Sequence, residues 1–313
     1  MNMRRRELLG AIGILGTGAI LSGVAGPLAG LLKTVDYPVA SEVRSVMGSL
    51  LQINIARRNR ESLELLDMAF AEAMRLEALL TRHKPGAPLH GLNATGHIAT
   101  PPAELQQVLA AAIRHCRESG GFFDPTVFST QPAAIDGVNL GEDGISLARS
   151  GTSITLDGIA KGYVVDRLSQ LLHAHGAGNH LINAGGDIIA CGGGPSGFGW
   201  KIGLQDPRRQ GRLLTSFFLQ DGAVATSGNY ESLSPLGRGR AHILSPATAE
   251  AAAGTLSASA FAPSAMEADA MSTALFVMPS DYRRDYMRMK NNAACYVVSK
   301  SGNHEKIGKL ALL

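Results

Sequence analysis

The chain has 313 residues, of which 45% are hydrophobic and 18% charged, enough to bury a sizeable core as one large domain or two fused lobes. The formal net charge is +3, and three of the basic residues are Arg4, Arg5 and Arg6, so the body of the chain carries no basic excess. With aromatic residues at 5%, this composition gives no electrostatic case for nucleic-acid binding.

The first 30 residues have the pattern of an export signal. A basic start is followed by a glycine-rich and alanine-rich stretch without charge, which lasts until Lys33. Arg5-Arg6-x-Leu8-Leu9 resembles a twin-arginine signal, which directs proteins that are already folded out of the cytoplasm. The alternative is a single membrane anchor, since Leu8–Leu32 is long enough to cross a bilayer, although Pro27 makes it a poor spanning helix.

The N-terminal pattern also sets the expected domain organisation and location. We expect residues 1–30 to be an export signal or anchor that contacts the membrane, residues 31–45 to be a linker, and residues 46–313 to be the folded domain. The protein is then expected in the periplasm or at the outer face of the cytoplasmic membrane of a bacterium.

Apolar spacing predicts the elements of the first half of the domain. Leu51, Ile53 and Ile55 alternate as in a half-buried strand, and Leu63, Leu66 and the apolar residues after them recur at helical spacing. The predicted elements are a strand Ser49–Ile55, a helix Arg60–Leu80, a loop Thr81–Gly96, a helix Pro101–Arg117 capped by Thr100 and ended by Gly120 and Gly121, and loop and hairpin over Ser129–Arg149.

Strands dominate the predicted second half. Ser264 and Glu267 have the spacing of a capping box at the start of a helix. The predicted elements are a short strand Ser153–Leu156, a helix Ile159–Ala174, strands His180–Asn183 and Asp187–Cys191 around a kink at Gly185 and Gly186, strands Trp200–Leu204, Thr215–Leu219, Val224–Thr226 and Ala241–Leu244, a helix Ser264–Met278, a strand at Tyr296–Val298 and a hairpin at Ser301–Asn303. Strands mixed with a few helices predict an α+β fold, with mixed or antiparallel sheets and packed helices.

The three cysteines do not suggest a metal or redox motif. Cys116, Cys191 and Cys295 show no CxxC spacing and cannot all pair within one chain. We expect buried free thiols.

Three glycine-rich segments are too polar to be ordinary core: Leu156–Tyr163, Asn183–Ile188 and Ala268–Thr273. Each places an acidic residue beside small residues at the expected edge of a strand or start of a helix. Carboxylates next to bare backbone can hold a divalent cation and phosphate oxygens. The segments that complete this constellation are Phe123–Val127, Ala225–Tyr230 and His242–Pro246.

Two of these segments suggest specific chemistry, each with a structural alternative. Asp269 and Thr273 lie four residues apart on a helix, so they can supply two ligands to Mg²⁺, or else form a solvated face with a Thr hydroxyl bonded to the backbone. Asp157–Tyr163 reads as a strand-to-helix junction whose N–H groups and Lys161 bind an anion, or as a plain turn capped by Asp157.

The remaining segments of the constellation also have both a functional and a structural interpretation. The paired glycines of Asn183–Asp187 let a flat ligand approach the backbone, or form a β-bulge. His242 is a proton acceptor or a hydrogen-bonded core histidine. Phe123-Asp124-Pro125 stacks a ring and accepts a hydrogen bond, or forms an Asp-Pro turn.

Seven motifs follow one another between residues 45 and 300: Met47–Ser49, Gly121–Val127, Asp157–Asp166, Asn183–Asp187, Ala225–Tyr230, His242–Pro246 and Glu267–Thr273. In this order they resemble the ApbE-like family, the FAD:protein FMN transferases. The resemblance implies an α+β fold that holds FAD in a cleft. It also implies Mg²⁺-dependent transfer of FMN from FAD to a Thr or Ser hydroxyl of a target protein, with release of AMP.

The resemblance also implies roles for individual residues. Asp269, Thr273 and the backbone carbonyl of Gly158 would bind Mg²⁺. Lys161 and the metal would offset charge on the pyrophosphate, and His242 or an Asp of the metal site, such as Asp269, would take the proton of the attacking hydroxyl. The FAD-binding set would be Met47, His83, Phe122, Phe123, Asp124, Thr155, Asp157, Lys161, Gly185, Gly186 and Ile243.

The sequence departs from the family pattern at two of these positions. Thr155 stands where the family often has Asp, so the first acidic contact is Thr155 or moves to Asp157. The loop that in the family carries an aromatic residue reads Thr81–Pro88 here, so isoalloxazine stacking would fall to His83.

The acceptors that the resemblance implies are flavoprotein subunits of membrane electron-transport complexes. Two other functions fit the same site. Water in place of the protein hydroxyl would make the protein an FAD pyrophosphatase that yields FMN and AMP. A site without catalysis would make it an FAD-binding envelope protein.

Overall fold

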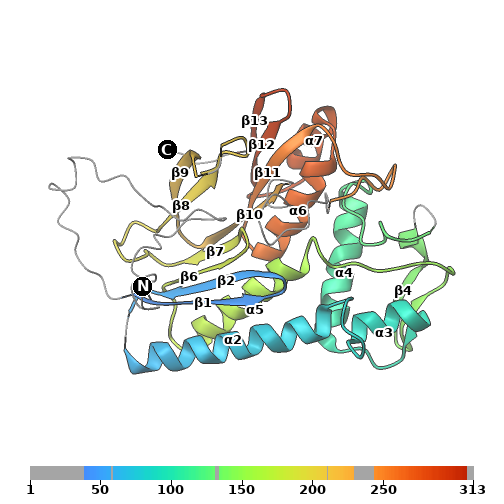
Figure 1. Ribbon diagram of the computed structural model, residues 1–313, viewed down its shortest axis with the longest axis horizontal. Coiled ribbons are helices and arrows are strands. Elements are labelled where there is room, and N and C mark those ends of the chain that lie inside the picture. The colour runs from blue at the N-terminus through green and yellow to red at the C-terminus, as the bar shows by residue number, and fades with distance from the viewer. Residues whose placement is uncertain (1–38, 58, 131–133, 210, 229–242, 309–313) are drawn as a thin grey trace, which may run out of the picture.

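A single antiparallel sheet of eight strands organises the molecule (Figure 1). The computed structural model describes residues 39–57, 59–130, 134–209, 211–228 and 243–308. In sheet order the strands are β1 (Ala40–Val46), β2 (Ser49–Ile55), β6 (His180–Ala184), β7 (Asp187–Cys191), β10 (Gly222–Gly228), β11 (Thr255–Ala262), β12 (Ala294–Ser299) and β13 (His304–Ile307). The predicted α+β class with antiparallel sheets is confirmed.

Each face of the sheet carries its own hydrophobic core. Helices α2 (Arg60–Leu80), α5 (Ala160–Ala174) and α6 (Ala265–Val277) pack on one face, with fully buried Phe70 and Phe276 in the larger cluster. A two-stranded sheet, β8 (Trp200–Gln205) and β9 (Leu213–Leu219), covers the other face over a smaller cluster centred on Trp200. The sheet therefore separates two layers with different environments.

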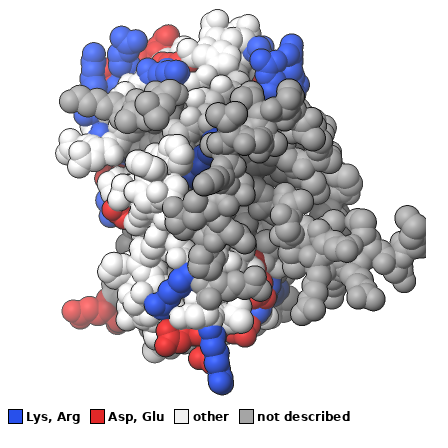
Figure 2. All heavy atoms as spheres, turned by 90° about the vertical axis from the view of Figure 1, so that its left-hand side faces the viewer, with Lys and Arg blue, Asp and Glu red and all other residues white. Residues whose placement is uncertain are grey.

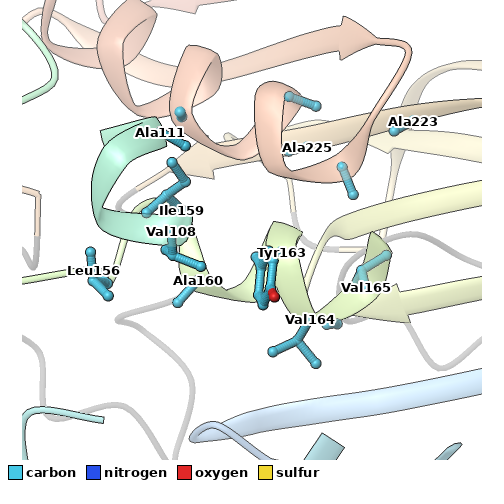
Figure 3. Close-up of a cluster of buried hydrophobic side chains, with 14 of the residues drawn as sticks. Val108, Ala111, Leu156, Ile159, Ala160, Tyr163, Val164, Val165, Ala223 and Ala225 are labelled. Atoms are coloured by element: carbon cyan, nitrogen blue, oxygen red, sulfur yellow. The ribbon is translucent and has the colours of Figure 1, made fainter. Parts of the chain in front are cut away.

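The remaining elements gather at one end of the sheet, to the right in Figure 1. Helix α4 packs on α5: Figure 3 shows Val108 and Ala111 of α4 beside Ile159 and Tyr163. The elements at this end are α3 (Pro88–Thr95), β3 (His97–Ile98), α4 (Ala103–Glu118), a 3₁₀ turn η1 (Ala134–Gly137), β4 (Val138–Gly141) and β5 (Gly144–Leu147), while α7 (Ser280–Arg288) follows α6.

Helices α5 and α6 cross with almost no space between their backbones. A Cβ placed on Gly162 would lie 2.3 Å from the carbonyl oxygen of Ala265. One turn further along α5, Asp166 accepts hydrogen bonds from the backbone N–H groups of Ala265 (2.7 Å) and Met266 (2.9 Å). These N–H groups have no partner inside their own helix, so Asp166 fixes the start of α6 on α5.

Most of the long periodic segments form as predicted. Strand β2 and helix α2 have the predicted bounds, and β6, β7, β8, β9, β10, α4, α5, α6 and β12 occupy the predicted segments. Ser264 caps α6 and accepts a hydrogen bond from the N–H of Glu267 (3.2 Å). The prediction of unpaired thiols is confirmed, with Cys116 and Cys295 buried and Cys191 half-buried.

The predicted linker is wrong over its last six residues, because Ala40–Val46 forms β1. A two-residue turn connects this edge strand to β2, and the two strands pair along their whole length. Its polar residues hid the strand pattern, and an edge strand tolerates them because one side faces solvent. Arg44, for example, pairs with Glu42 at 2.7 Å.

Two local predictions between residues 81 and 156 are also wrong. The predicted loop Thr81–Gly96 contains α3, which starts with Pro88 in its first turn and ends at Gly96 in the left-handed conformation (φ 74°). The segment Ser153–Leu156 is not a strand. Its backbone bonds to side chains and loops instead, as when the N–H of Ile154 donates to Asn93 Oδ1 (2.7 Å).

Other differences are smaller. Helix α4 begins at Ala103 after Pro102, so Thr100 is not its cap. Leu63, predicted to face inward, is 50% exposed. Strand β11 and helix α7 were not predicted, because Thr255–Ala262 is rich in Ser and Ala and Ser280–Arg288 is mostly charged. Leu244 makes only an isolated bridge with Ala251, and no longer strand is described there.

Within the described residues, no helix is long and apolar enough to cross a membrane. The predicted export signal or anchor, residues 1–30, and residues 31–38 of the predicted linker lie outside them.

The crossing of α5 and α6 leads to a stability prediction. Gly162→Ala should destabilise the protein by about 1–3 kcal/mol or more, because the added methyl group meets backbone that cannot move independently. Chemical denaturation measures the free energy of unfolding. The matched control is Gly91→Ala in α3, where nothing lies within 4 Å of the added Cβ, and it should be neutral or stabilising by roughly 0.5–1 kcal/mol. Equal effects of the two substitutions would contradict the tight crossing.

Candidate active site

A cavity of about 500 Å³ opens where the β1–β2 turn, the end of α2 and the starts of α5 and α6 meet. Most of the sequence-predicted site residues line it: Met47, His83, Phe122, Phe123, Asp124, Thr155, Asp157, Gly158, Lys161, Gly185, Ile243, Asp269 and Thr273. Gly186 does not, since it lines a separate small hollow beside β8. His242 lies outside the described residues.

The rim beside α2 is formed by the β1–β2 turn. Met47 and Gly48 both have left-handed backbone conformations (φ 53° and 70°), as a two-residue hairpin turn requires. Glu77 holds this turn by accepting a hydrogen bond from the N–H of Met47 (3.1 Å), and Lys84 pairs with Glu77 at 2.9 Å. Burial raises the pKa of Glu77, but these two bonds outweigh it and leave the pKa below its usual value.

Glu77 was missed in the sequence analysis, although a signal existed. It stands four residues after Ala73 and three before Leu80, both buried, so it is a carboxylate at the border of the apolar face of α2. Such a placement is costly unless the carboxylate has a partner.

The proposed metal ligands do come together. A Cβ on Gly158 would lie 2.9 Å from Thr273 Oγ1, so the turn before α5 touches the face of α6. Asp269, one turn before Thr273, is 3% exposed and accepts a hydrogen bond from the N–H of Gly162 at 3.0 Å. The alternative of a solvated helix face is therefore wrong.

These residues fit a hard cation by donor type. They offer a carboxylate, a hydroxyl and a backbone carbonyl, all oxygen donors of the kind that Mg²⁺ and Ca²⁺ prefer. Across the described residues, no three His, Cys, Asp or Glu side chains gather as a metal centre. A cation here would thus depend on protein oxygens other than carboxylates and on oxygens of water or substrate.

A buried carboxylate pair and one ammonium dominate the electrostatics of this corner. Lys161 forms an ion pair with Asp187, which is 2% exposed. Burial raises the pKa of Asp187, while Lys161 lowers it. Burial, and then the charge of Asp187, raise the pKa of Asp269 to about 7, against the effect of Lys161. Two carboxylates against one close ammonium favour the binding of a further cation.

Asp187 lies in a predicted segment but was not among the predicted site residues. Gly185 and Gly186 (φ 63° and 102°) form a two-residue turn between β6 and β7, in which Ala184 pairs with Asp187. The β-bulge alternative is therefore wrong. Asn183 accepts a hydrogen bond from the N–H of Gly186 at 2.9 Å, which closes the turn. The hairpin thus places Asp187, the first residue of β7, in the lining of the cavity.

Asp157, which also lines the cavity, is paired with an arginine outside the lining. Arg82 donates to Asp157 (2.9 Å) and lies over the ring of Phe128, 4.6 Å from its centre. Asp157 is not the cap of α5, because the capping position is Ile159 and makes no side-chain bond. Instead, the hydroxyl of Thr155 accepts a hydrogen bond from the N–H of Asp157 (3.2 Å). Arg82 and Lys84 were not predicted as site residues, although they flank His83, which was.

The two neighbouring phenylalanines differ in their accessibility. Phe123 is 3% exposed and belongs to the hydrophobic core, with its ring against Gly158. Phe122 is half-buried and packs its ring on Tyr282, with ring centres 5.7 Å apart. Asp124 accepts hydrogen bonds from the N–H (2.7 Å) and hydroxyl (2.6 Å) of Thr126, as expected for the Asp-Pro turn. Phe122 is thus the more available ring for a flat ligand.

A hydroxyl cluster completes the floor of the cavity. Ser227, near the end of β10, lies 2.8 Å from Ser272 Oγ and 3.4 Å from Thr273 Oγ1. Its neighbour Thr226 bonds to Ser259 of β11 at 2.8 Å. Of the segment Ala225–Tyr230, which was predicted as part of the constellation, Asn229 and Tyr230 lie outside the described residues. In the described part, Ser227 lies beside the proposed metal ligand Thr273.

The described geometry agrees with comparisons to known proteins. A family model described as the ApbE family matches residues 47–133 and 129–297. The FAD:protein FMN transferase of Treponema pallidum is 29% identical over 306 residues, with 83% of each chain covered. The FAD:protein FMN transferase of Haemophilus influenzae is 28% identical over 264 residues, which cover 73% of this chain and 76% of the relative.

Solved structures show the same fold. The ApbE protein of Thermotoga maritima superposes with a TM-score of 0.75 at 24% identity, covering 86% of this chain and 96% of that one. The flavin transferase ApbE of Vibrio cholerae gives the same TM-score and coverage at 19% identity. The resemblance stated from the sequence motifs is confirmed at the level of family and fold.

His115, behind Phe123, leads to a prediction about pH. Its buried ring lies edge-on to that of Phe123, and neither ring nitrogen has a hydrogen-bond partner among the described residues. Burial lowers the pKa of His115 to about 4. Below about pH 6.5 this histidine is protonated in the unfolded chain, whereas in the folded protein it stays neutral down to about pH 4. His115 should therefore lower the free energy of unfolding by up to about 3 kcal/mol as the pH falls through this range.

The measurement compares the free energy of unfolding at pH 7 and pH 4.5 in wild type and in His115→Leu. The variant keeps an apolar side chain in contact with Phe123 but cannot titrate. It should lose less stability than wild type on acidification, whatever other groups contribute to both proteins. An equal loss would mean that the ring accepts a proton in the folded state.

Proposed function

The chain belongs to the ApbE family, and we propose that it is an FAD:protein FMN transferase, which moves FMN from FAD to a Thr or Ser hydroxyl of a target flavoprotein and releases AMP. The single observation that carries this proposal is the cavity in which Lys161, Asp187, Asp269 and Thr273 converge, because these residues come from three distant family motifs. A cavity of about 500 Å³ is within the range of cofactor-binding sites.

Recognition of FAD is divided between the two rims. Phe122, backed by Tyr282, offers a ring face for the isoalloxazine, and exposed His83 lies at the mouth. Lys161 offsets negative charge of the pyrophosphate, and the ion pair with Asp187 holds the ammonium group of Lys161 in place. Arg82 and Lys84 add positive charge at the entrance.

Mg²⁺ is proposed as the cofactor, held by Asp269, Thr273 and the carbonyl of Gly158. When bound, it would withdraw charge from the phosphate oxygens and raise the electrophilicity of phosphorus. The protein's own contribution is positioning. Gly162 donates to Asp269, and Ser227 lies beside Thr273, so both proposed ligands are oriented by neighbours.

The attacking hydroxyl must lose its proton. We propose His242 as the base, since the residue after it, Ile243, lines the cavity. Asp269, which lines the same cavity, is the alternative base.

The function is tested with purified protein, FAD, Mg²⁺ and a candidate acceptor flavoprotein subunit of a membrane electron-transport complex. We expect covalent flavin on the acceptor, detected as in-gel fluorescence and a mass increase, and AMP in solution. EDTA should stop the reaction, and Mg²⁺ should restore it. Free FMN without flavinylated acceptor would instead identify an FAD pyrophosphatase, and intact FAD would identify a flavin carrier.

Asp269→Asn should lower transfer by at least 100-fold, on the scale of other losses of a charge-stabilising group at a reaction centre. The matched control is Glu267→Gln on the same helix, which is half-buried and does not line the cavity. It should retain wild-type transfer. Normal transfer by Asp269→Asn, or full transfer in excess EDTA, would overturn the proposed metal site.

We further propose that the protein is exported and acts in the periplasm or at the outer face of the cytoplasmic membrane. The support is the pattern of residues 1–30. Arg5→Lys combined with Arg6→Lys should keep the protein in the cytoplasm, because the twin-arginine route reads this pair. Cell fractionation measures the distribution. Unchanged export would point to another route or to a plain anchor.

A further inference from the structure

A second hollow lies on the side of the sheet away from the helices, and it is strongly basic. It has a volume of about 310 Å³ and is lined by Asp206, Arg208, Arg209, Arg212, Leu214, Val298 and His304. It shares no residue with the candidate active site. Its arginines all come from the turn between β8 and β9, and nothing in the proposed reaction uses them.

This turn is held in shape by its own backbone. The N–H of Asp206 donates to the carbonyl of Arg212 (2.8 Å), and the N–H of Arg209 donates to the carbonyl of Asp206 (3.1 Å). The carboxylate of Asp206 accepts a hydrogen bond from the N–H of Arg208 (3.0 Å), so this carboxylate stabilises the turn. These bonds join the described residues of the turn, and such bonds lower the cost of ordering the backbone when a ligand binds.

The positive charge of the turn is poorly compensated. In the part of the chain that the structure describes, no carboxylate pairs with the side chain of Arg208, Arg209 or Arg212. The guanidinium of Arg208 donates to the carbonyl of Ser299 (3.2 Å), which ties the turn to β12. Exposed Lys300 and Lys306 extend the positive charge along β12 and β13. On the face that Figure 2 shows, Lys and Arg side chains lie toward the upper left and upper right, with Asp and Glu side chains among those on the left.

The lining indicates the chemical class of ligand. Guanidinium groups form paired hydrogen bonds to the oxygens of a phosphate, and Arg is better suited to this than Lys. Partly buried Leu214 adds an apolar side chain that a bare inorganic ion would not use, while Val298 is 1% exposed. A phosphate ester with an apolar portion satisfies both parts of the hollow.

The described part of the chain begins on the same side of the sheet. Val39, the first described residue, packs against the hydrophobic cluster that also contains Leu214 and Val298. Residues 1–30 have the sequence pattern of a segment that enters the membrane. Val39 thus lies on the face of the sheet that carries the basic hollow, at the β1 end of the strand order, whereas the hollow lies at the end of β12 and β13. An anionic bilayer attracts exposed basic side chains.

We propose that the basic hollow binds the phosphate headgroup of an anionic phospholipid and so orients the folded domain on the membrane surface. This inference does not depend on the transferase reaction. It does use the proposed membrane contact of the N-terminal segment to choose a lipid over other phosphate compounds.

The test measures partition of the full-length protein onto vesicles by flotation, in about 0.1 M salt. Vesicles of phosphatidylcholine alone are compared with vesicles that contain phosphatidylglycerol. The test variant is Arg208→Gln with Arg209→Gln and Arg212→Gln. The control variant removes the same charge from other exposed positions, Arg60→Gln with Arg114→Gln and Arg288→Gln, none of which lines the hollow.

Phosphatidylglycerol should strengthen binding of the wild type and of the control variant. The test variant should lose most of that gain, by about fivefold per arginine and on the order of 100-fold in total. High salt should abolish the gain in all three proteins. An equal loss in the test and control variants would overturn the proposal, because net charge alone would then account for binding.

Two further measurements separate other ligands from a lipid. Line broadening of inorganic phosphate in ³¹P NMR reports free-anion binding. If the hollow broadens phosphate but gives no preference for phosphatidylglycerol, it is a free-anion site and the lipid proposal is wrong. If the protein binds neither phosphate nor anionic vesicles through these arginines, but binds an acidic polypeptide through them, the hollow is a protein-docking surface and the proposal is likewise wrong.

Discussion

The candidate active site depends on how closely α5 approaches α6. The crossing at Gly162 leaves no space for a side chain, and Asp166 bonds the first N–H groups of α6 to α5. Because of this contact, Asp269 can accept a hydrogen bond from Gly162, and Thr273 can touch Gly158. Residues more than 100 positions apart in the chain thus form one corner, and its geometry is set by backbone rather than by flexible side chains.

That corner is electrostatically unfavourable on its own. Asp187 and Asp269 are both nearly fully buried, and Lys161 is the ammonium that pairs with the first of them. Burying two carboxylates costs free energy that one ion pair offsets only in part. The rise in the pKa of both groups is the sign of this cost. A bound cation would relieve the excess negative charge, which explains why such an arrangement suits a binding site better than a structural core.

The sequence was most informative where periodicity was long or a motif was dense. Helix α2 and strand β2 have the predicted bounds, because their apolar spacing reports directly which face is buried. Strand β11 was missed because its buried residues include Thr255 and Ser259, whose hydroxyls are satisfied by Arg283 and Thr226. A polar residue that finds its partner only in the folded protein gives no apolar signal in the sequence.

The same reasoning separates the site residues that were predicted from those that were not. Lys161, Asp269 and Thr273 stand inside short motifs, whereas Glu77 acts through a turn 30 residues before it. Its partner, the N–H of Met47, is a backbone group that every residue but proline carries, so no sequence pattern could identify the contact.

The two cores on opposite faces of the sheet also separate the two proposed sites. The active-site cavity lies on the helical side, and the basic hollow lies on the side of β8 and β9. Substitutions in distant sites without shared partners generally have independent effects. A domain held to a membrane by one face can therefore keep its catalytic cavity unchanged, provided that the cavity mouth stays clear of the bilayer. The sheet places a layer of backbone between the basic hollow and the active-site cavity.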